Sequence, residues 1–369
     1  MKVLLMGDGS AYHANLATAL RAMGHSVTVA SDGTRWMNTA RDIDLARRPG
    51  KLSGALLWLR LSQLDAKRLR GYDVVQLSSP GFAPLRPSRL RKLLHRLKAE
   101  NGAVCLSALG TDTNYVLANL ASPPALGYSE WQVAGERTPW SFTEASESRL
   151  WLSDELRAYT EEFYSKIDGA VSALYEYHKV IEATHPALPL AYGGIPIVTQ
   201  GLPQHRRNDG PVKILHAVHR GREAEKGADK LLEMLRCLEH DMPGQVIVDT
   251  PDNVPYSEFL PRLAGYDMVS DQLYSYTPAT TALLAMAMGV VPISGGEEEF
   301  YEFIGERQLR PIFNADPLDL DRTFERLKSL VADRRRLSAM AGQGAEFVSR
   351  HNEAGIVAKR FVDFWTSIL

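Results

Sequence analysis

The sequence alternates short apolar segments with amphipathic ones, and it does so in two separate stretches. Apolar runs typical of buried strands occur at residues 2–6, 26–31, 73–77, 103–109, 169–173 and 188–192, with segments of helical periodicity between most of them. Further strand-like runs follow at residues 212–218, 245–250, 267–272, 290–294 and 310–313. Strands that alternate with helices form parallel sheets covered by helices. We therefore predict an α/β fold with two doubly wound parallel sheets.

A segment rich in glycine, proline and charge, residues 193–211, separates the two stretches. A chain of 369 residues is long for a single hydrophobic core and suits two domains. We predict an N-terminal domain of residues 1–195, a linker of residues 196–211 and a C-terminal domain of residues 212–351. The last segment, residues 352–369, reads as an amphipathic helix.

The overall composition is typical of a globular protein, with 45% hydrophobic and 23% charged residues. Cys105 and Cys237 lie in apolar contexts and are too few for a disulfide framework. No apolar run approaches the roughly 18 residues of a spanning helix, and Asp8 interrupts the first one. These features predict a cytoplasmic location.

Positive charge is concentrated in the first part of the chain. Residues 1–110 contain 17 Lys and Arg but 7 Asp and Glu, whereas the whole chain has a net charge of −2. Most of the excess lies in residues 35–98, beside the short apolar stretch 52–61. This combination predicts contact with an anionic membrane surface; a solvated helical face is the alternative. We expect no nucleic-acid partner, because no pattern of stacking aromatics accompanies the charge.

A basic loop joins the predicted strand 212–218 to the predicted helix 228–240. It places Arg220, Arg222 and Lys226 ahead of the helix. The N-terminus of a helix favours an anion, and guanidinium and ammonium groups would hold a diphosphate there. Ordinary surface charges are the alternative. His216, at the end of the strand, either lines this site or is a hydrogen-bonded core residue.

Two glycine loops follow predicted strands. Gly295 and Gly296 follow strand 290–294, and Gly7 and Gly9 follow strand 2–6. Glycines at such positions let the backbone approach a ligand closely. The dinucleotide fingerprint would need a third glycine where Tyr12 stands, which argues against an NAD enzyme. Together with the basic loop, the glycines predict a nucleotide-sugar pocket.

Asp112 follows the fourth strand of the N-terminal domain. Ligands of open α/β sheets bind at the carboxyl ends of the strands, so Asp112 is a candidate contact for sugar or acceptor. A local turn or helix cap is the alternative. We predict no metal site, because the Asp-x-Asp pair Asp42 and Asp44 lies in a basic stretch expected to be helical.

The paired α/β domains, the linker and the closing helix resemble the GT-B glycosyltransferase architecture. The C-terminal half resembles retaining glycosyltransferases of family 4 (glycosyl transferases group 1). Residues 220–227 match the Arg and Glu-Lys-Gly motif of that group, and residues 284–296 match its Ala-Met-Ala-x-Gly segment, strand and Gly-Gly. The resemblance implies two Rossmann-like domains and a helix at 352–369 that crosses back to the first domain.

One departure concerns two glutamates that the group carries eight positions apart. Tyr276 and Leu284 occupy these positions. In the group, the first glutamate contacts the sugar and the second holds the donor ribose. Four nearby residues are candidate substitutes in donor binding: Asp271, Gln272, Glu297 and Glu299.

The resemblance and the loops together predict a metal-independent, retaining glycosyltransferase of polysaccharide biosynthesis. It would move a sugar from a nucleoside-diphosphate sugar, a substrate and not a cofactor, to a hydroxyl of a cell-envelope glycan or lipid-linked acceptor. Arg222, Lys226 and Asp112 are the predicted catalytic residues. The expected location is cytoplasmic and peripheral on the inner membrane face. A nucleotide-sugar 2-epimerase and a non-catalytic nucleotide-sugar-binding subunit are the alternatives.

Overall fold

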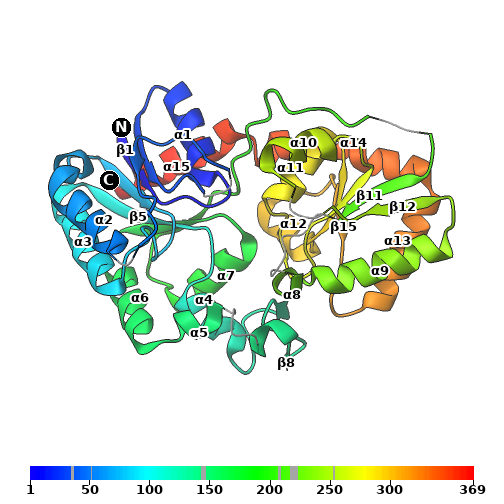
Figure 1. Cartoon of the computed structure of the whole chain (residues 1–369), viewed down its shortest axis with the longest axis horizontal. Coiled ribbons are helices and arrows are strands. Elements are labelled where there is room, and N and C mark those ends of the chain that lie inside the picture. Colours follow the sequence, from blue (N-terminus) through cyan, green and yellow to red (C-terminus); the bar gives the residue numbers. More distant parts are fainter. Residues whose placement is uncertain (35–36, 51, 143–146, 207–208, 217–222, 252–253) are drawn as a thin grey trace. The chain divides into compact units, whose positions relative to one another are not determined.

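A seven-stranded parallel sheet is the centre of the first of two units in the computed structural model, which describes residues 1–369 except 35–36, 51, 143–146, 207–208, 217–222 and 252–253 (Figure 1). Its strands are β1 (Lys2–Met6), β2 (Ser26–Ser31), β3 (Ile43–Asp44), β4 (Val74–Leu77), β5 (Ala103–Ala108), β9 (Gly169–Ser172) and β10 (Leu190–Tyr192). They are ordered β10-β9-β5-β4-β1-β2-β3. The order reverses at β1, which lies between β2 and β4, and ligands of such sheets bind near this point.

Helices connect these strands and close the first unit. They are α1 (Tyr12–Ala22), α2 (Ser53–Leu59), α3 (Pro87–Glu100), α4 (Thr113–Leu120), α5 (Glu147–Trp151), α6 (Asp154–Lys166), α7 (Tyr175–Thr184) and α15 (Ala354–Ile368). The last helix, α15, packs against α1. The indole Nε1 of Trp365 donates a hydrogen bond to Oε1 of Gln76, 2.9 Å away, on the buried strand β4. The C-terminal helix therefore returns to the first unit, as predicted.

The second unit contains a five-stranded parallel sheet. Its strands are β11 (Val212–His216), β12 (Val246–Asp249), β13 (Met268–Ser270), β14 (Val291–Ser294) and β15 (Phe313–Asn314), in the order β12-β11-β13-β14-β15. Its helices are α8 (Glu223–Lys226), α9 (Ala228–Asp241), α10 (Tyr256–Leu263), α11 (Thr280–Met288), α12 (Glu298–Ile304), α13 (Leu320–Ala332) and α14 (Arg334–His351).

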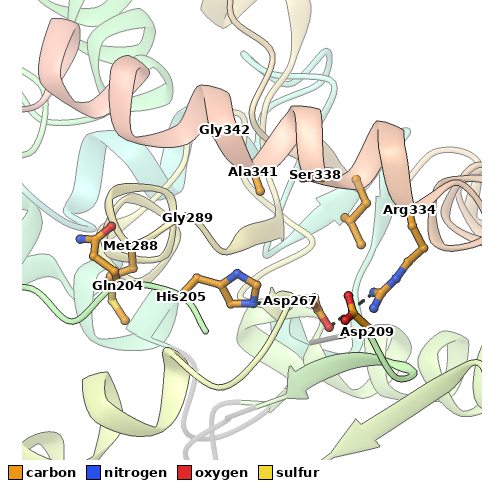
Figure 2. A pocket seen from close by; sticks show the side chains of 11 residues that line it. Gln204, His205, Asp209, Asp267, Met288, Gly289, Arg334, Ser338, Ala341 and Gly342 are labelled. Atoms are coloured by element: carbon orange, nitrogen blue, oxygen red, sulfur yellow. Dashed lines mark ion pairs between the residues drawn. The ribbon is translucent and has the colours of Figure 1, made fainter. Parts of the chain in front are cut away.

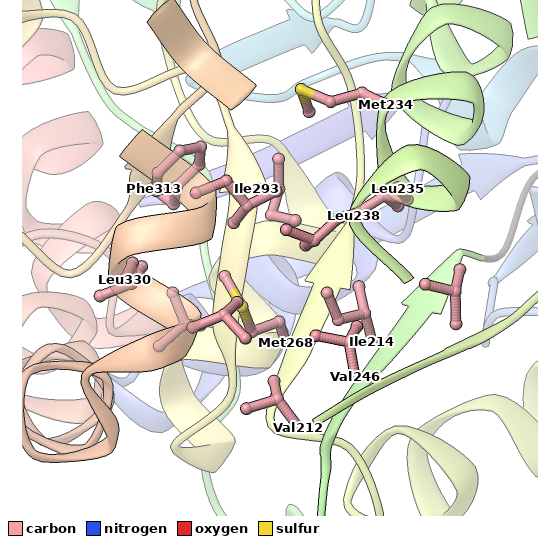
Figure 3. Close-up of a cluster of buried hydrophobic side chains, with 14 of the residues drawn as sticks. Val212, Ile214, Met234, Leu235, Leu238, Val246, Met268, Ile293, Phe313 and Leu330 are labelled. Carbon is pink, nitrogen blue, oxygen red and sulfur yellow. The ribbon is translucent and has the colours of Figure 1, made fainter. Parts of the chain in front are cut away.

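Two apolar clusters cover the two faces of this sheet. Figure 3 shows the first, in which Leu235 and Leu238 of α9 and Leu330 of α13 pack against the strands. The second joins α10 and α11 to the opposite face through residues such as Leu263 and Ala285. Burial on both faces explains why the strands read as continuous apolar runs in the sequence. The predicted α/β fold with two doubly wound parallel sheets is confirmed.

Segment 119–146 interrupts the first unit in sequence but groups with the second. By contacts, unit 1 comprises Met1–Ala118, Glu147–Pro196 and Ala354–Leu369, and unit 2 comprises Asn119–Ser146 and Ile197–Glu353. The sequence-based division places this segment with residues 1–195. It contains the antiparallel strands β6 (Tyr128–Ser129), β7 (Gln132–Val133) and β8 (Glu136–Arg137). Buried aromatic residues anchor it: Tyr128, Trp131 and Trp140.

The stretch that contains Asp42 and Asp44 is not helical, contrary to the prediction. It forms β3, which pairs with β2 at the edge of the sheet. The carboxylate of Asp42 accepts a hydrogen bond from the backbone N–H of Val29 at 2.8 Å and forms an ion pair with Arg21. This pairing with a neighbouring strand overrides the local helical preference.

Candidate functional site

Lys226 and Asp271 meet at the carboxyl edge of the second sheet. The Nζ of Lys226 donates a hydrogen bond to Oδ1 of Asp271 at 3.1 Å. The Lys226 side chain is 29% exposed and that of Asp271 is 2% exposed. Oδ2 of Asp271 is buried and has no hydrogen-bond partner among the described residues. A buried carboxylate oxygen without a donor is costly, so this atom is suited to accept a hydrogen bond from a ligand.

Gly227 fixes the position of Lys226 at the amino end of α9. It has φ +64°, and a Cβ there would lie 2.8 Å from Cβ of Leu273. The carbonyl of Lys226 accepts a hydrogen bond from the N–H of Leu273 at 2.8 Å. The turn thus holds the lysine beside the residues that follow β13. Arg220 and Arg222, predicted to share this role, lie outside the described residues.

His216, at the end of β11, is buried and close to β13. Its Nδ1 lies 3.1 Å from Oγ of Ser270. The whole residue is 6% exposed. Burial lowers the pKa of His216 to about 4, so the ring is neutral near pH 7. The neutral ring thus lies buried at this sheet edge, beside Ser270.

Gly295 fits tightly against neighbouring backbone, and Gly296 lies close to a neighbouring side chain. A Cβ on Gly295 would overlap the carbonyl oxygen of Ser275, and one on Gly296 would lie 3.0 Å from Ile312. The N–H of Gly296 donates to Oδ1 of Asn314 at 2.9 Å. Packing within the unit is therefore enough to require glycine at position 295, because no side chain fits there beside the segment that follows β13.

Glu297 anchors segment 119–146 to this loop. Its Oε1 lies 2.8 Å from the Tyr128 hydroxyl and accepts a hydrogen bond from Nδ2 of Asn314 at 2.9 Å. Two further candidates for donor binding differ in exposure: Gln272 is half-buried, whereas Glu299 is exposed in the first turn of α12. Of the acidic candidates after Gly296, Glu297 is thus occupied by internal hydrogen bonds.

Aromatic and aliphatic side chains fill the two positions where the resembled group has glutamates. Tyr276 stacks on Tyr128 with ring centroids 4.3 Å apart and an interplanar angle of 15°. The N–H of Tyr128 donates to the Tyr276 hydroxyl at 3.1 Å. Burial, followed by the charges of Glu299 and Glu297, raises the pKa of Tyr276. Leu284 is buried in α11. Sequence reasoning missed Tyr128, whose only signal is an aromatic residue after glycine in an irregular stretch.

In the first unit, a buried polar network supports the loop that contains Gly7 and Gly9. Gly7 has φ +81°, and a Cβ there would overlap Oγ of Ser78, whereas Gly9 faces open space. The carboxylate of Asp8 accepts hydrogen bonds from the N–H groups of Gly9 at 2.8 Å and His13 at 2.9 Å. Burial outweighs these bonds and raises the pKa of Asp8 to about 6. This loop therefore carries a buried carboxyl group whose pKa is raised by burial.

Asp112 is buried in the first unit and caps α4. Its Oδ1 accepts a hydrogen bond from the N–H of Tyr115 at 2.9 Å, and its Oδ2 accepts one from the hydroxyl of Tyr164 at 2.7 Å. Burial raises the pKa of Asp112. Tyr164 in turn stacks on His185 with centroids 4.1 Å apart. These contacts are those of a helix cap, which is the alternative to a ligand contact in the sequence analysis.

A cavity of about 370 Å³ lies at the opposite, amino-terminal edge of the second sheet (Figure 2). Asp267, which precedes β13, lies 3.5 Å from Nε2 of His205 and 3.6 Å from Nη1 of Arg334. Burial alone would raise the pKa of Asp267, but the His205 ring and the N–H of Lys213 hold it below its usual value. The contact with Asp267 thus holds His205 against the second unit, far from the carboxyl ends of the strands.

No group of three or more His, Cys, Asp or Glu suited to a metal ion occurs within the described part of the chain. Likewise, no helix among the described residues is both long enough and apolar enough to cross a membrane.

Comparison with known proteins identifies the fold. No family model matches this chain, and no curated protein matches it in sequence. Solved structures do match over its whole length. Sucrose-phosphate synthase from Thermosynechococcus elongatus is 13% identical, with a TM-score of 0.61 over 100% of this chain and 99% of that one. Anabaena HepE, solved in complex with UDP and glucose, is 13% identical, with a TM-score of 0.59 over 100% of both chains.

This chain has the GT-B fold. A putative UDP-N-acetylglucosamine 2-epimerase from Listeria monocytogenes also matches, at 12% identity and a TM-score of 0.53 over 98% of this chain and 94% of that one. At these identities the likeness concerns the fold alone. In a GT-B chain, the pair Lys226 and Asp271 lies in the second Rossmann-like unit, at the sheet edge where open α/β folds bind ligands.

Proposed function

We propose that this protein is a metal-independent, retaining glycosyltransferase. It transfers a sugar from a nucleoside-diphosphate sugar to a hydroxyl of a cell-envelope glycan or lipid-linked acceptor at the cytoplasmic membrane face. The single observation that supports this most is the placement of Lys226 at the amino end of α9, beside the buried Asp271 and on a GT-B fold. Similar structures contain UDP or UDP-glucose, which supports a nucleotide-sugar donor.

The proposed chemistry depends on charge that develops during the reaction. As the bond to the anomeric carbon breaks, negative charge grows on the β-phosphate of the leaving group. The Lys226 ammonium and the N–H groups at the start of α9 would stabilise this charge more strongly in the transition state than in the ground state. Arg220 and Arg222 would add to it. A positioned cation that is removed costs on the order of 10²-fold in rate.

Asp271 would complete the donor site. Its Oδ2, which has no hydrogen-bond partner among the described residues, would accept a hydrogen bond from a hydroxyl of the ribose or of the sugar. This role would replace part of what the resembled group assigns to the glutamates at the positions of Tyr276 and Leu284. Gln272, half-buried next to Asp271, would line the same side of the donor site.

The test is nucleotide binding followed by turnover. Thermal-shift and calorimetric titrations with UDP, GDP and their sugars identify the donor before an acceptor is known. Lys226→Ala is expected to weaken binding of the matching nucleotide and to slow transfer. Lys328→Ala is the matched control, because Lys328 also forms an ion pair, with Asp241 at 2.6 Å, but on the exposed surface. Equal binding and turnover in both variants would remove Lys226 from the site.

Asp112 enters the proposal as a contact of the acceptor hydroxyl. Asp112→Asn keeps an oxygen that accepts from the Tyr115 N–H, so the cap on α4 is largely preserved. Intact donor binding with reduced transfer would support the catalytic role. Full transfer activity in Asp112→Asn would show that Asp112 only caps helix α4.

Two other functions are each favoured by one observation. The match to a putative 2-epimerase favours conversion of a nucleotide sugar without an acceptor, and an acceptor-free product assay separates it from transfer. Tyr276 and Leu284, in place of glutamates, favour a subunit that binds nucleotide sugar without turnover. Such a subunit would bind the donor but release no free nucleotide with any acceptor.

A further inference from the structure

Helix α2 and the turn after it expose an apolar row on the first unit. Leu57 and Leu61 are buried, with exposed fractions of 5% and 0%, and attach this segment to the unit. The other leucines of the segment point to solvent and form what we name the leucine ridge: Leu52 (72% exposed), Leu56 (61%), Leu59 (56%) and Leu64 (78%). Isolated exposed leucines are common, but an exposed group of this kind marks an interaction surface.

The backbone aligns the ridge on one side of the segment. Leu52, Leu56 and Leu59 are spaced i, i+4 and i+7, which places them on one face of a helix. Residues Arg60–Leu64 then form a π-turn, closed by a bond from the N–H of Asp65 to the carbonyl of Arg60 at 2.9 Å. Because one π-turn contains more residues than an α-turn, Leu64 follows Leu59 along the row.

Basic residues that have no acidic partner within the described part of the chain flank the ridge. The nearby acidic residues are already in ion pairs: Asp42 with Arg21, Asp44 with Arg41, and Asp65 with Arg60 and Arg68. Exposed basic residues for which the described part of the chain provides no acidic partner lie on both sides in sequence: Arg47, Arg48, Lys67 and Arg70. Arg96 of the basic helix α3 donates to the carbonyls of Ser62 and Ala66, which joins α3 to this surface.

A small basic cavity opens beside the ridge. It measures about 300 Å³ and is lined by Arg47, Arg48 and Arg60 together with Ser53 and Leu56. One carboxylate, that of Asp44, also lines it and is held in an ion pair with Arg41. Nε and Nη2 of Arg47 donate to Oγ of Ser53 at 3.1 and 3.0 Å, which orients that guanidinium. Nη2 of Arg60 is buried and has no hydrogen-bond partner among the described residues. Guanidinium groups with unused N–H donors bind phosphate oxygens.

We propose that the leucine ridge and this arginine cavity dock the first unit on an anionic lipid bilayer. The leucines enter the interfacial region of the bilayer, and the cavity receives a lipid phosphate. An apolar row beside basic residues is the combination that interfacial helices use, because apolar burial and attraction to anionic lipids act together. Nucleic acid would gain nothing from four exposed leucines. The inference stands apart from the donor chemistry, since it concerns only residues of the first unit.

Co-sedimentation with vesicles tests the proposal. The full-length protein is expected to bind vesicles of phosphatidylcholine with phosphatidylglycerol and to bind pure phosphatidylcholine much more weakly. The variant Leu52→Ser/Leu56→Ser/Leu59→Ser should lose at least about tenfold in vesicle affinity. Leu318→Ser is the matched control, because Leu318 is 53% exposed but lies in the second unit. Nucleotide binding should be the same in all three proteins, which separates this test from the proposed function.

A second pair of substitutions tests the arginine cavity separately. Arg47→Ala/Arg48→Ala should reduce binding to the anionic vesicles by about tenfold or more and leave the weak binding to neutral vesicles unchanged. Lack of binding to anionic vesicles overturns the proposal. So does equal binding by the wild type and the leucine variant, which would leave only non-specific charge attraction. A wild-type dimer that becomes monomeric in the leucine variant, without a change in vesicle binding, would assign the ridge to a second copy of the chain instead.

Discussion

The ammonium of Lys226 lies 3.1 Å from one oxygen of Asp271, and the other oxygen of that carboxylate is buried without a hydrogen-bond partner among the described residues. Asp271 therefore fixes the lysine but also places negative charge where a diphosphate would arrive. The pair has two separable consequences, one for stability and one for binding.

Removal of Lys226 should destabilise the fold more in the presence of Asp271 than in the presence of a neutral asparagine at the same position. Lys226→Ala leaves a buried carboxylate without its cation, and we expect a loss of about 1–3 kcal/mol, less than for a fully buried pair because Lys226 is partly exposed. Adding Asp271→Asn should restore part of that loss. Urea denaturation of both single variants and the double variant measures the coupling. A coupling energy below about 0.3 kcal/mol would show that the two side chains do not interact.

Asp271→Asn should separate nucleoside binding from phosphate binding. The free Oδ2 is proposed to accept a hydroxyl hydrogen, so binding of the nucleoside diphosphate should weaken about tenfold. Inorganic pyrophosphate has no such hydroxyl and is repelled by the carboxylate, so its binding should be unchanged or tighter. Calorimetric titration with both ligands checks this. Parallel losses for both ligands would contradict the hydroxyl contact.

Gly295 and Gly9 should respond in opposite ways to alanine. A Cβ on Gly295 would overlap the backbone of Ser275, which cannot move aside, whereas a Cβ on Gly9 meets no atom within 4 Å. Gly295→Ala should cost about 3 kcal/mol or prevent folding, and Gly9→Ala should change stability by less than about 0.5 kcal/mol. Thermal melts of the two variants make the comparison. If Gly295→Ala melts like the wild type, the close approach to Ser275 is not real.

The stack of Tyr128 on Tyr276 should hold segment 119–146 on the second unit. Tyr276→Phe keeps the stacked ring but loses the hydroxyl that accepts from the Tyr128 N–H, at an expected cost of about 1 kcal/mol. Tyr276→Ala also loses the ring and should cost about 3 kcal/mol or more. Limited proteolysis should cut segment 119–146 faster in the alanine variant. Equal cleavage in both variants would mean that other contacts fasten the segment.

Asp8 should make stability depend on pH in a defined direction. Burial raises the pKa of Asp8 from 3.8 to about 6, so the folded state binds its proton more tightly than the unfolded state. The stability that the protonated Asp8 side chain contributes to the folded state is complete below about pH 4. It is lost as the pH rises through 6. Asp8→Asn cannot ionise and should therefore be more stable than the wild type above pH 6, by on the order of 2 kcal/mol.

The same variant should show no advantage near pH 4. His13, whose pKa burial lowers to about 4, titrates in both proteins and cancels in the comparison. Urea denaturation at several pH values measures the difference. An advantage for Asp8→Asn that did not vary with pH would place its cause elsewhere than in the carboxylate.

Local features of the fold could be predicted because they depend on neighbours in sequence. Helix α11, Thr280–Met288, ends at Gly289, which has φ +82° and forms the helix C-cap. The buried strands are continuous apolar runs, so periodicity locates them. Asp42 and Asp44 were misplaced in a helix because the pairing of β3 with β2 is a contact between distant residues.

The sequence by itself determined two parallel-sheet units, their covering helices and the glycines at the strand ends, because hydrophobic periodicity and backbone conformation are local properties. Only the tertiary structure decided which side chains meet. Lys226 and Asp271 are 45 residues apart and become neighbours because β11 pairs with β13. Tyr128 and Tyr276 are 148 residues apart and stack because segment 119–146 folds onto the second unit. Such contacts depend on strand order and packing, which no local pattern encodes.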